Sequence, residues 1–382
     1  MPSLLKELHA YGQAPWLDFI DRTYLQEGHL HQLVERDGVS GVTSNPSIFE
    51  KAIGKGDAYD EQISQIVADR PGASAIEIYE ALAVRDIQHA CDILHGVYAA
   101  TQAADGYVSI EVSPTLADDT NGTIEEGRRL WTQVDRPNLM IKVPGTRAGV
   151  PAVRALIEAG INVNVTLLFD VDAYGAVAQA YIDGLEARHA AGESIASIAS
   201  VASFFISRID ARIDKKIDER VTAGDTQSND LLAIRGSVAM ANAKAAYRTF
   251  STIFDCARWS ALAEKGGKVQ RLLWASTGTK DPSFPDTTYV DGLIGPGTVN
   301  TMPLDTLNAF RDHGTADRTI DRNVARAVQI LETAADLGLN LTGINAHLLE
   351  EGLDVFKKAH QDLLGAIEGK LGALRRSMTL SA

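Results

Sequence analysis

The sequence has little cysteine and no long apolar run. Its 382 residues include only two cysteines, Cys91 and Cys256, which lie far apart. Two distant cysteines rule out a disulfide scaffold or a cysteine zinc site, and they are typical of a reducing compartment. No apolar stretch approaches the ~18 residues of a membrane span. Residues 1–8 include Lys6 and Glu7 and lack the apolar core of a secretion signal. We therefore expect a cytoplasmic protein without a membrane anchor.

Basic residues are also scarce relative to acidic ones. The chain has 36 Lys and Arg against 50 Asp and Glu, which gives a net charge of −14. Such a chain is a poor binder of nucleic acid or anionic lipid over a broad surface, although a small phosphate can still bind at a local basic site. With 45% hydrophobic and 23% charged residues, the composition is that of a globular protein.

Several common functional motifs are absent. The sequence contains no G-x-G-x-x-G, Walker A or G-x-S-x-G motif. It has no H-E-x-x-H motif and no cluster with metal-ligand spacing, and His29 and His31, near a predicted turn, are expected to be solvated. We therefore expect no metal site, which disfavours a metal-dependent aldolase.

Short apolar runs alternate with longer segments of helical periodicity, about eight times in all. Strand followed by helix predicts a parallel sheet, and a count of eight favours a closed (β/α)8 TIM barrel of the α/β class over an open doubly wound sheet. An open sheet usually has a glycine-rich turn after its first strand, where this chain has Asp21-Arg22-Thr23. The predicted strands are Trp16–Ile20, Gly41–Asn45, Tyr107–Ser113, Leu139–Pro144, Ile161–Phe169, Ser200–Ile206, Leu272–Thr277 and Gly292–Val299.

We expect one barrel domain over residues 1–382, with additional helices. Helical insertions are predicted around 46–106 and 208–270, and a C-terminal helical extension from about residue 320, in which Ala346–Leu374 forms one or two amphipathic helices. The predicted helices are Ala75–Ala104, Ala148–Ala159, Asp172–Ala190 and Asp230–Ala257 between strands, and Arg322–Leu337 after the last strand.

A lysine lies near the end of the fourth predicted strand, in Leu-Met-Ile-Lys142-Val-Pro. In a barrel the carboxyl ends of the strands form the active site. Burial disfavours the ammonium form, and a neutral lysine attacks carbonyl carbon to form a Schiff base. The alternative is a lysine whose stem is buried while its amino group reaches solvent.

Other polar residues alternate with apolar ones in neighbouring strands. The two-residue period places Ser109, Glu111 and Ser113 on one face, so Glu111 points into the barrel. There it can relay protons through a water or form an ion pair with an inward lysine. In the fifth strand Asn162, Asn164 and Thr166 share a face that suits sugar hydroxyls or forms a self-satisfied polar ladder.

Three more strands carry polar residues near their ends. With the three strands above, six strands now carry one lysine, two acids and several hydroxyl or amide groups. This set of side chains is typical of a lysine-dependent site for a polyol carbonyl compound. The additional positions are Asp18 on the first strand, Thr43, Ser44 and Asn45 on the second, and Ser203, Phe205 and Ser207, followed by Arg208, on the sixth.

These motifs resemble the transaldolase family of the class I Schiff-base aldolase superfamily, enzymes of the pentose phosphate pathway. The resemblance extends from about residue 10 to about residue 315 and looks like the longer bacterial branch. The matching segments, in family order, are Gly41-Val-Thr-Ser-Asn-Pro-Ser47, Ile141-Lys-Val-Pro144, Asn164-Val-Thr-Leu-Leu-Phe169, Ser203-Phe-Phe-Ile-Ser-Arg208, Leu273-Trp-Ala-Ser-Thr-Gly-Thr-Lys280 and Val299-Asn-Thr-Met-Pro303.

The resemblance implies a role for each matching residue. Lys142 would form the Schiff base, Glu111 would act through a water held by Thr166, and Asp18 would take the C4 hydroxyl proton. Many members have a second phosphate-binding arginine after strand seven, but here no arginine occurs between Leu272 and Pro282. The binding residues would be Asn45, Asn164 and Ser203 for hydroxyls, and Arg208 and Ser276, with Lys280 in place of the second arginine, for phosphate.

The implied activity is transfer of a dihydroxyacetone unit, without metal or organic cofactor. Sedoheptulose 7-phosphate and glyceraldehyde 3-phosphate would give erythrose 4-phosphate and fructose 6-phosphate. One alternative is a related fructose 6-phosphate aldolase that releases dihydroxyacetone, for which a tyrosine is expected near Phe205. Another is a non-catalytic sugar-phosphate binding barrel. The only expected ligands are sugar phosphates, and both a monomer and a homodimer are compatible with the sequence.

Overall fold

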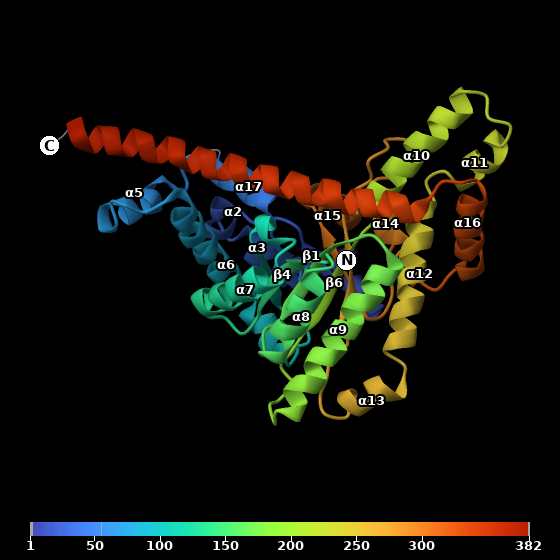
Figure 1. Ribbon diagram of the computed structural model, residues 1–382, viewed down its shortest axis with the longest axis horizontal. Helices are drawn as coiled ribbons and strands as arrows, with labels where there is room; N and C mark the ends of the chain where they lie inside the picture. The colour runs from blue at the N-terminus through green and yellow to red at the C-terminus, as the bar shows by residue number, and fades with distance from the viewer. Residues whose placement is uncertain (1–2, 55, 381–382) are drawn as a thin grey trace.

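The computed structural model, which describes residues 3–54 and 56–380, is a closed barrel of parallel strands surrounded by helices (Figure 1). Each strand pairs with the next along the chain, and β8 pairs with β1, so the barrel has no free edge. This confirms the predicted (β/α)8 barrel. The strands are β1 (Gln13–Leu17), β2 (Gly41–Thr43), β3 (Tyr107–Glu111), β4 (Leu139–Pro144), β5 (Val163–Leu168), β6 (Ser200–Phe205), β7 (Arg271–Ala275) and β8 (Thr298–Met302).

Helices cover the outside of the barrel and extend beyond it. The α-helices are α1 (Leu4–Ala10), α2 (Arg22–Gln26), α3 (His29–Gln32), α4 (Pro46–Gly54), α5 (Asp60–Asp69), α6 (Ala75–Ala100), α7 (Thr120–Val134), α8 (Gly149–Glu158), α9 (Val171–Ala190), α10 (Ser207–Thr222), α11 (Ser228–Ile234), α12 (Val238–Ile253), α13 (Ala257–Ala263), α14 (Thr288–Asp291), α15 (Leu304–His313), α16 (Val324–Asp336) and α17 (Leu341–Leu380), with a π-turn segment η1 (Leu33–Asp37) and a 3₁₀ turn η2 (Pro114–Leu116).

Strands β2 to β7 lie where the apolar runs predicted them, with ends that differ by at most two residues. Almost every residue in these strands is buried, as expected for parallel strands that have helices on one side and the barrel interior on the other. The apolar side chains form one hydrophobic cluster, which includes the fully buried Trp16 and Trp274.

The first and last strands differ from the prediction. β1 begins three residues before the predicted run because Gln13 is buried and donates a 2.9 Å hydrogen bond to Thr298 of β8. Asp18 therefore follows β1 directly and does not lie within it. The prediction of Gly292–Val299 was wrong for β8, because buried Leu293 and Ile294 belong to a loop that turns at Gly297, with φ +71°. The true strand has Thr298, Asn300 and Thr301 buried, so it lacks a continuous apolar run.

Two helix predictions were corrected. The predicted helix Asp230–Ala257 is divided into α11 and α12 at Gly236, whose φ of +68° ends α11. An added Cβ there would lie 2.3 Å from Cζ of Phe284, so the chain packs tightly at this turn. The predicted Ala346–Leu374 stretch is one long helix, α17, which begins five residues earlier. No helix in the described part of the chain meets the length and hydropathy needed to cross a membrane.

The polar triplet Asp21-Arg22-Thr23, in the turn after β1, has a structural role. Asp21 caps α2 by accepting a 3.1 Å hydrogen bond from the Tyr24 backbone amide. Buried Arg22 donates a 2.9 Å bond to Asp86 of α6, and its guanidinium carbon lies 4.2 Å from the centre of the Tyr59 ring. This buried ion pair fixes the insertion between β2 and β3 against the first strand turn.

The long helix α17 crosses the mouth of the barrel (Figure 1). It packs on α4, which follows β2, and on α10, which follows β6. Because both helices begin at the carboxyl ends of their strands, α17 covers the end of the barrel at which side chains from several strands converge.

Candidate active site

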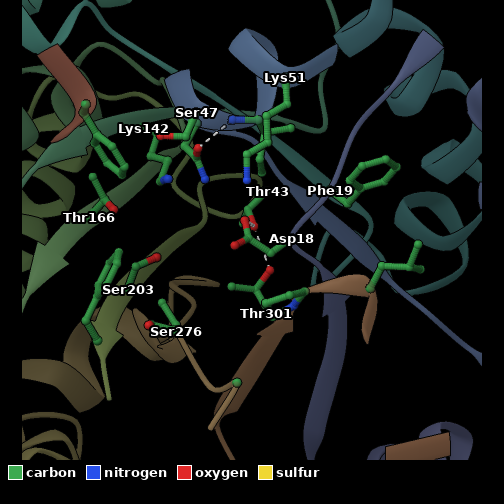
Figure 2. A pocket seen from close by; sticks show the side chains of 18 of the residues that line it. Asp18, Phe19, Thr43, Ser47, Lys51, Lys142, Thr166, Ser203, Ser276 and Thr301 are labelled. Atoms are coloured by element: carbon green, nitrogen blue, oxygen red, sulfur yellow. Dashed lines mark hydrogen bonds between the residues drawn. The ribbon is translucent and has the colours of Figure 1, made fainter. Parts of the chain in front are cut away.

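A cavity of about 640 Å³ opens at the carboxyl ends of the strands (Figure 2). Of the predicted site residues, all but two line it. The exceptions are Glu111 and Asn164, which lie behind the cavity wall. The predicted residues that line the cavity are Asp18, Asn45, Lys142, Thr166, Ser203, Phe205, Arg208, Ser276 and Lys280.

Lys142 and Glu111 form a buried ion pair beside the cavity. They are register partners on β4 and β3, so both side chains point inward at the same level of the barrel. Nζ of Lys142 lies 3.1 Å from Oε2 of Glu111 and donates a 3.1 Å hydrogen bond to the Ser44 carbonyl oxygen. The side chains are only 5% and 3% exposed, so Lys142 does not reach bulk solvent. The alternative prediction that the amino group of Lys142 reaches solvent was therefore wrong. The prediction that Glu111 forms an ion pair with an inward lysine is confirmed.

The Glu111 carboxylate has unused hydrogen-bonding capacity. Burial raises its pKa, and the neighbouring Lys142 opposes that rise. Although Nζ of Lys142 is close, neither oxygen of Glu111 accepts a well-directed hydrogen bond from the described residues, and Oγ1 of Thr166 has no partner either. Buried polar atoms usually have a partner. Glu111 and Thr166 can therefore bind a polar ligand or a water without breaking an existing contact.

Asp18 is the second carboxylate of the site. Its Oδ1 accepts a 2.7 Å hydrogen bond from Oγ1 of Thr43, which lies 2.7 Å from Oγ1 of Thr301. The single Thr43 hydroxyl proton goes to Asp18, so Thr301 donates to Thr43. The three side chains form a hydrogen-bonded chain from the end of β1 through β2 to β8 (Figure 2). Burial raises the pKa of Asp18, opposed first by Lys142 and then by the Thr43 hydrogen bond and Arg208.

Asn164 supports a neighbouring residue and does not face the cavity. Its Oδ1 accepts a 2.7 Å hydrogen bond from Oγ of Ser203, and its Nδ2 donates a 3.0 Å bond to Oγ of Ser109. The protein engages the Asn164 oxygen and one amide proton, and the predicted contact of Asn164 with substrate stays a prediction. Asn164 instead orients Ser203, which does line the cavity.

The orientation of the Thr166 side chain depends on a bulge in β5. The register between β5 and β6 shifts between Val165 and Leu168, and Leu167 has a φ of +60°, which is rare for a branched residue. Bulges beside active sites redirect side chains. Here the bulge places Thr166 in the cavity wall, while Leu167 turns toward α17.

Asn45 has a structural task as well as a place in the cavity wall. Its Oδ1 accepts a 3.0 Å hydrogen bond from the Ile48 backbone amide and so caps the start of α4. Asn45 also lines the cavity, where its amide group is within reach of a ligand. The Asn-Pro sequence after β2 therefore both starts the helix and places an amide group in the cavity wall.

Two cations lie at the opposite side of the cavity, near the ends of β6 and β7. Burial lowers the pKa of Arg208, and burial together with the nearby Arg208 charge lowers the pKa of Lys280. Neither cation forms an ion pair with another described residue. Ser276 is held beside them with a φ of +56° and an Oγ–Oγ distance of 2.9 Å to Ser207. Unpaired neighbouring cations with hydroxyls fit an anionic group of phosphate type.

The ring of Phe205 lies beneath Arg208. The guanidinium carbon is 5.2 Å from the ring centre, and the Phe169 ring packs 5.3 Å away on centroids. This packing holds Arg208 over the cavity. It also leaves an apolar surface where a tyrosine hydroxyl would otherwise reach into the site.

Sequence reasoning missed three kinds of cavity residue. Thr301 was missed because β8 was predicted too early in the chain. Ser47 and Lys51 on α4 and Phe19 after β1 had no polar-in-strand signal. Phe356 comes from α17, and an amphipathic pattern does not reveal which apolar residue faces a site in another part of the fold. Among the described residues, no three His, Cys, Asp or Glu side chains are grouped to hold a metal ion.

Comparison with known proteins agrees with this geometry. Residues 15–367 match the family described as Transaldolase/Fructose-6-phosphate aldolase. A protein of Nostoc sp. named Transaldolase 2 is 50% identical over 97% of this chain and 98% of its own length. Transaldolases of Thermobifida fusca and Mycolicibacterium smegmatis are 45% and 43% identical, over 98% and 97% of this chain and 100% and 98% of their own lengths. The chain belongs to the transaldolase/fructose-6-phosphate aldolase family.

Proposed function

We propose that the protein is a transaldolase that transfers dihydroxyacetone between sugar phosphates through a Schiff base on Lys142. The observation that carries the proposal is the buried Lys142–Glu111 pair at 3.1 Å. It borders a cavity that also contains Asp18 and two cations, Arg208 and Lys280, that form no ion pair within the described part of the chain. A lysine, two carboxylates with raised pKa values and a phosphate-type anion site suit the cleavage of a phosphorylated ketose.

The reaction begins when Lys142 transfers a proton to Glu111 and attacks the C2 ketone of the donor. A proton then moves from the attacking nitrogen to the C2 oxygen, which gives a neutral carbinolamine. The raised pKa of Glu111 makes the carboxylate able to accept and return this proton. Glu111 then protonates the departing C2 hydroxyl of the carbinolamine through a water held by Thr166. The protonated C2 hydroxyl departs as water and leaves an iminium ion, which is the electron sink for the next step.

Asp18 performs the second proton transfer. It takes the C4 hydroxyl proton, the C3–C4 bond breaks, and its electron pair neutralises the iminium to give an enamine on Lys142. The aldehyde product leaves. An acceptor aldose phosphate then reacts at the enamine carbon, Asp18 returns the proton to the new C4 oxygen, and water releases the product ketose from Lys142.

The remaining residues bind the substrate. Arg208, Ser276 and Lys280 hold the terminal phosphate, while Asn45 and Ser203 contact hydroxyls and Asn164 orients Ser203. Lys280 supplies a point charge where many relatives would have a planar guanidinium. The donor and acceptor are sedoheptulose 7-phosphate and glyceraldehyde 3-phosphate, in the pentose phosphate pathway, and no cofactor takes part.

The two alternatives are less well supported. An aldolase that releases dihydroxyacetone would be expected to have a tyrosine near Phe205, whose ring carries no hydroxyl to donate a proton or orient water. A non-catalytic barrel gives no reason for burying Lys142 beside Glu111, because removing both charges from water is expensive. We place the reaction in the cytoplasm, which two free cysteines support.

Replacement of Lys142 by Met tests the proposal. We expect transfer from fructose 6-phosphate to fall by about 10³-fold or more, because the covalent route is lost. Circular dichroism should show that the fold is retained. Lys244→Met is the matched control, since Lys244 is also buried and donates hydrogen bonds to the carbonyls of Thr319 and Arg322, away from the cavity. Normal turnover in folded Lys142→Met protein would refute the Schiff-base assignment.

A further inference from the structure

The helix α17 is fixed across the barrel mouth by contacts along its length (Figure 1). Glu351 pairs with Arg212 of α10, and the His360 ring packs on Tyr79 of α6 with centroids 5.5 Å apart. Further along, Lys370 pairs with Asp60 of α5. At Gly352 the helix is so close to β5 that an added Cβ would lie 2.9 Å from Cδ2 of Leu167.

One residue of this helix reaches the cavity. Phe356 is 4% exposed and is the sole described residue of α17 in the cavity wall. Its ring centre lies 5.8 Å from Nζ of Lys142. The other close groups around that nitrogen are polar, namely the Ser44 carbonyl and the Glu111 carboxylate. Phe356 is therefore the apolar surface that lies over the reactive amine on the side toward α17.

The position of Phe356 matters because an enamine on Lys142 has two fates. It can add to an aldehyde, which is transfer. Alternatively, its terminal carbon can take a proton to give an iminium, water can add to C2, and the amine can leave. In that second route the water oxygen becomes the ketone oxygen, and dihydroxyacetone and free Lys142 are released. A site in which water can deliver a proton to that terminal carbon therefore wastes the donor.

We propose that Phe356 excludes water from the Lys142 enamine and so determines how the enamine partitions between transfer and hydrolysis. This inference rests on the proposed function, because it concerns an intermediate of that reaction. The aromatic face is also well placed to favour the positively charged iminium. Through Phe356, the helix α17 contributes to the reaction even though it is not part of the barrel sheet.

The test measures two products, dihydroxyacetone and sedoheptulose 7-phosphate, for both Phe356→Ala and the unchanged protein. With fructose 6-phosphate alone, released dihydroxyacetone reports hydrolysis, and with added erythrose 4-phosphate, sedoheptulose 7-phosphate reports transfer. We expect the ratio of release to transfer to rise by about tenfold or more in Phe356→Ala. Phe356→Leu keeps much of the apolar volume and should restore most of the original ratio.

Two further variants separate this role from packing. Leu363→Ala removes a fully buried side chain of α17 outside the cavity wall, so it should lower thermal stability without changing the ratio. Val355→Ala, at a position that is 50% exposed, should change neither. If Phe356→Ala does not fold, Phe356→Leu should still show a smaller rise in the ratio.

The outcomes distinguish failure of the role of Phe356 from failure of the proposed function. An unchanged ratio in folded Phe356→Ala, or an equal rise in Leu363→Ala, would overturn the role of Phe356, while transfer by the unchanged protein upholds the proposed function. Where Phe356→Ala does not fold, a ratio in Phe356→Leu equal to that of the unchanged protein would overturn the role instead. If the unchanged protein forms no borohydride-stable adduct on Lys142, the proposed function fails and this inference fails with it.

Discussion

At the scale of single residues, the hydroxyl of Thr43 tunes the charge state of Asp18. Its 2.7 Å hydrogen bond to Oδ1 favours the ionised carboxylate, whereas burial raises the pKa of Asp18. Asp18 must be ionised to accept the C4 proton. Activity is therefore lost as the pH falls through its raised pKa, at a higher pH than an ordinary aspartate would allow.

Thr43→Val should move this acid limb to still higher pH. The variant loses the hydrogen bond that lowers the pKa of Asp18, so a larger fraction of the base is protonated at any given acidic pH. The measurement is kcat/KM for transfer against pH. Thr301→Val is the control, because Thr301 contacts Thr43 and leaves the bond to Asp18 in place. An acid limb that does not move in Thr43→Val would contradict the role of Asp18 as the base.

Phe205 should govern the balance between transfer and release in a different way from Phe356. Phe205→Tyr places a hydroxyl in the cavity that can donate a proton to the enamine or orient a water. We expect dihydroxyacetone release to rise about tenfold relative to transfer, measured with fructose 6-phosphate. Phe19→Tyr adds the same hydroxyl at another position of the cavity wall and should leave the balance unchanged. Unchanged partitioning in Phe205→Tyr would count against this interpretation.

The sequence predicted the catalytic candidates because charge in a buried strand is expensive. Lys142 and Glu111 lie within strands, and the register of β3 and β4 brings them together as the two-residue period implied. The same alternation did not reveal that Asn164 would be engaged by Ser109 and Ser203, because that depends on side chains from two other strands.

At the scale of elements, the close approach of α17 to β5 depends on Gly352. An added Cβ would lie 2.9 Å from Cδ2 of Leu167 and 3.5 Å from a terminal guanidinium nitrogen of Arg208. Leu167 is buried and has a strained backbone, so it has little room to move. Tight packing at this point holds α17 against the cavity.

Gly352→Ala should therefore destabilise the protein by about 1–3 kcal/mol through overpacking. Gly365→Ala on the same helix is a matched control, because no atom lies within 4 Å of the added Cβ. That change should stabilise the protein by about 0.5–1 kcal/mol through helix propensity. Denaturant unfolding of both variants measures the difference. A gain in stability for Gly352→Ala like that of Gly365→Ala would show that α17 does not pack as described.

Element boundaries were hardest to predict where polar residues are buried or glycines turn the chain. β8 has three buried polar residues and no continuous apolar run, so the apolar loop before it was mistaken for the strand. The break between α11 and α12 depends on Gly236 packing against Phe284, which is a contact between segments far apart in the sequence. Periodicity alone carries no information about such contacts.

At the scale of the whole molecule, the alternation of strands and helices was enough to predict the barrel. A closed sheet removes free edges, and eight strand–helix units are the number that closes it. The buried apolar side chains from Leu5 to Leu371 form one hydrophobic cluster, and the division of the chain into a single domain stays a prediction. The path of α17 over the mouth was not predictable, because an amphipathic helix can pack on many surfaces.

The charge distribution of the whole chain also suits the proposed chemistry. The net charge is −14, yet Arg208 and Lys280 lie at one side of the cavity without an ion pair to any residue that the structure describes. A local cationic site in an acidic protein binds a small phosphate and disfavours large polyanions. The fold thus supplies a selective anion site at one side of the cavity and a buried amine at another.

The proposed mechanism requires a covalent intermediate on Lys142, which reductive trapping detects. The protein is incubated with fructose 6-phosphate and borohydride, and the adduct is weighed by intact-mass spectrometry and located by peptide mapping. The account predicts one dihydroxyacetone-sized adduct on Lys142, and none on the control residue Lys244. Folded protein that carries no adduct on Lys142 would contradict it and would favour a sugar-phosphate binding barrel.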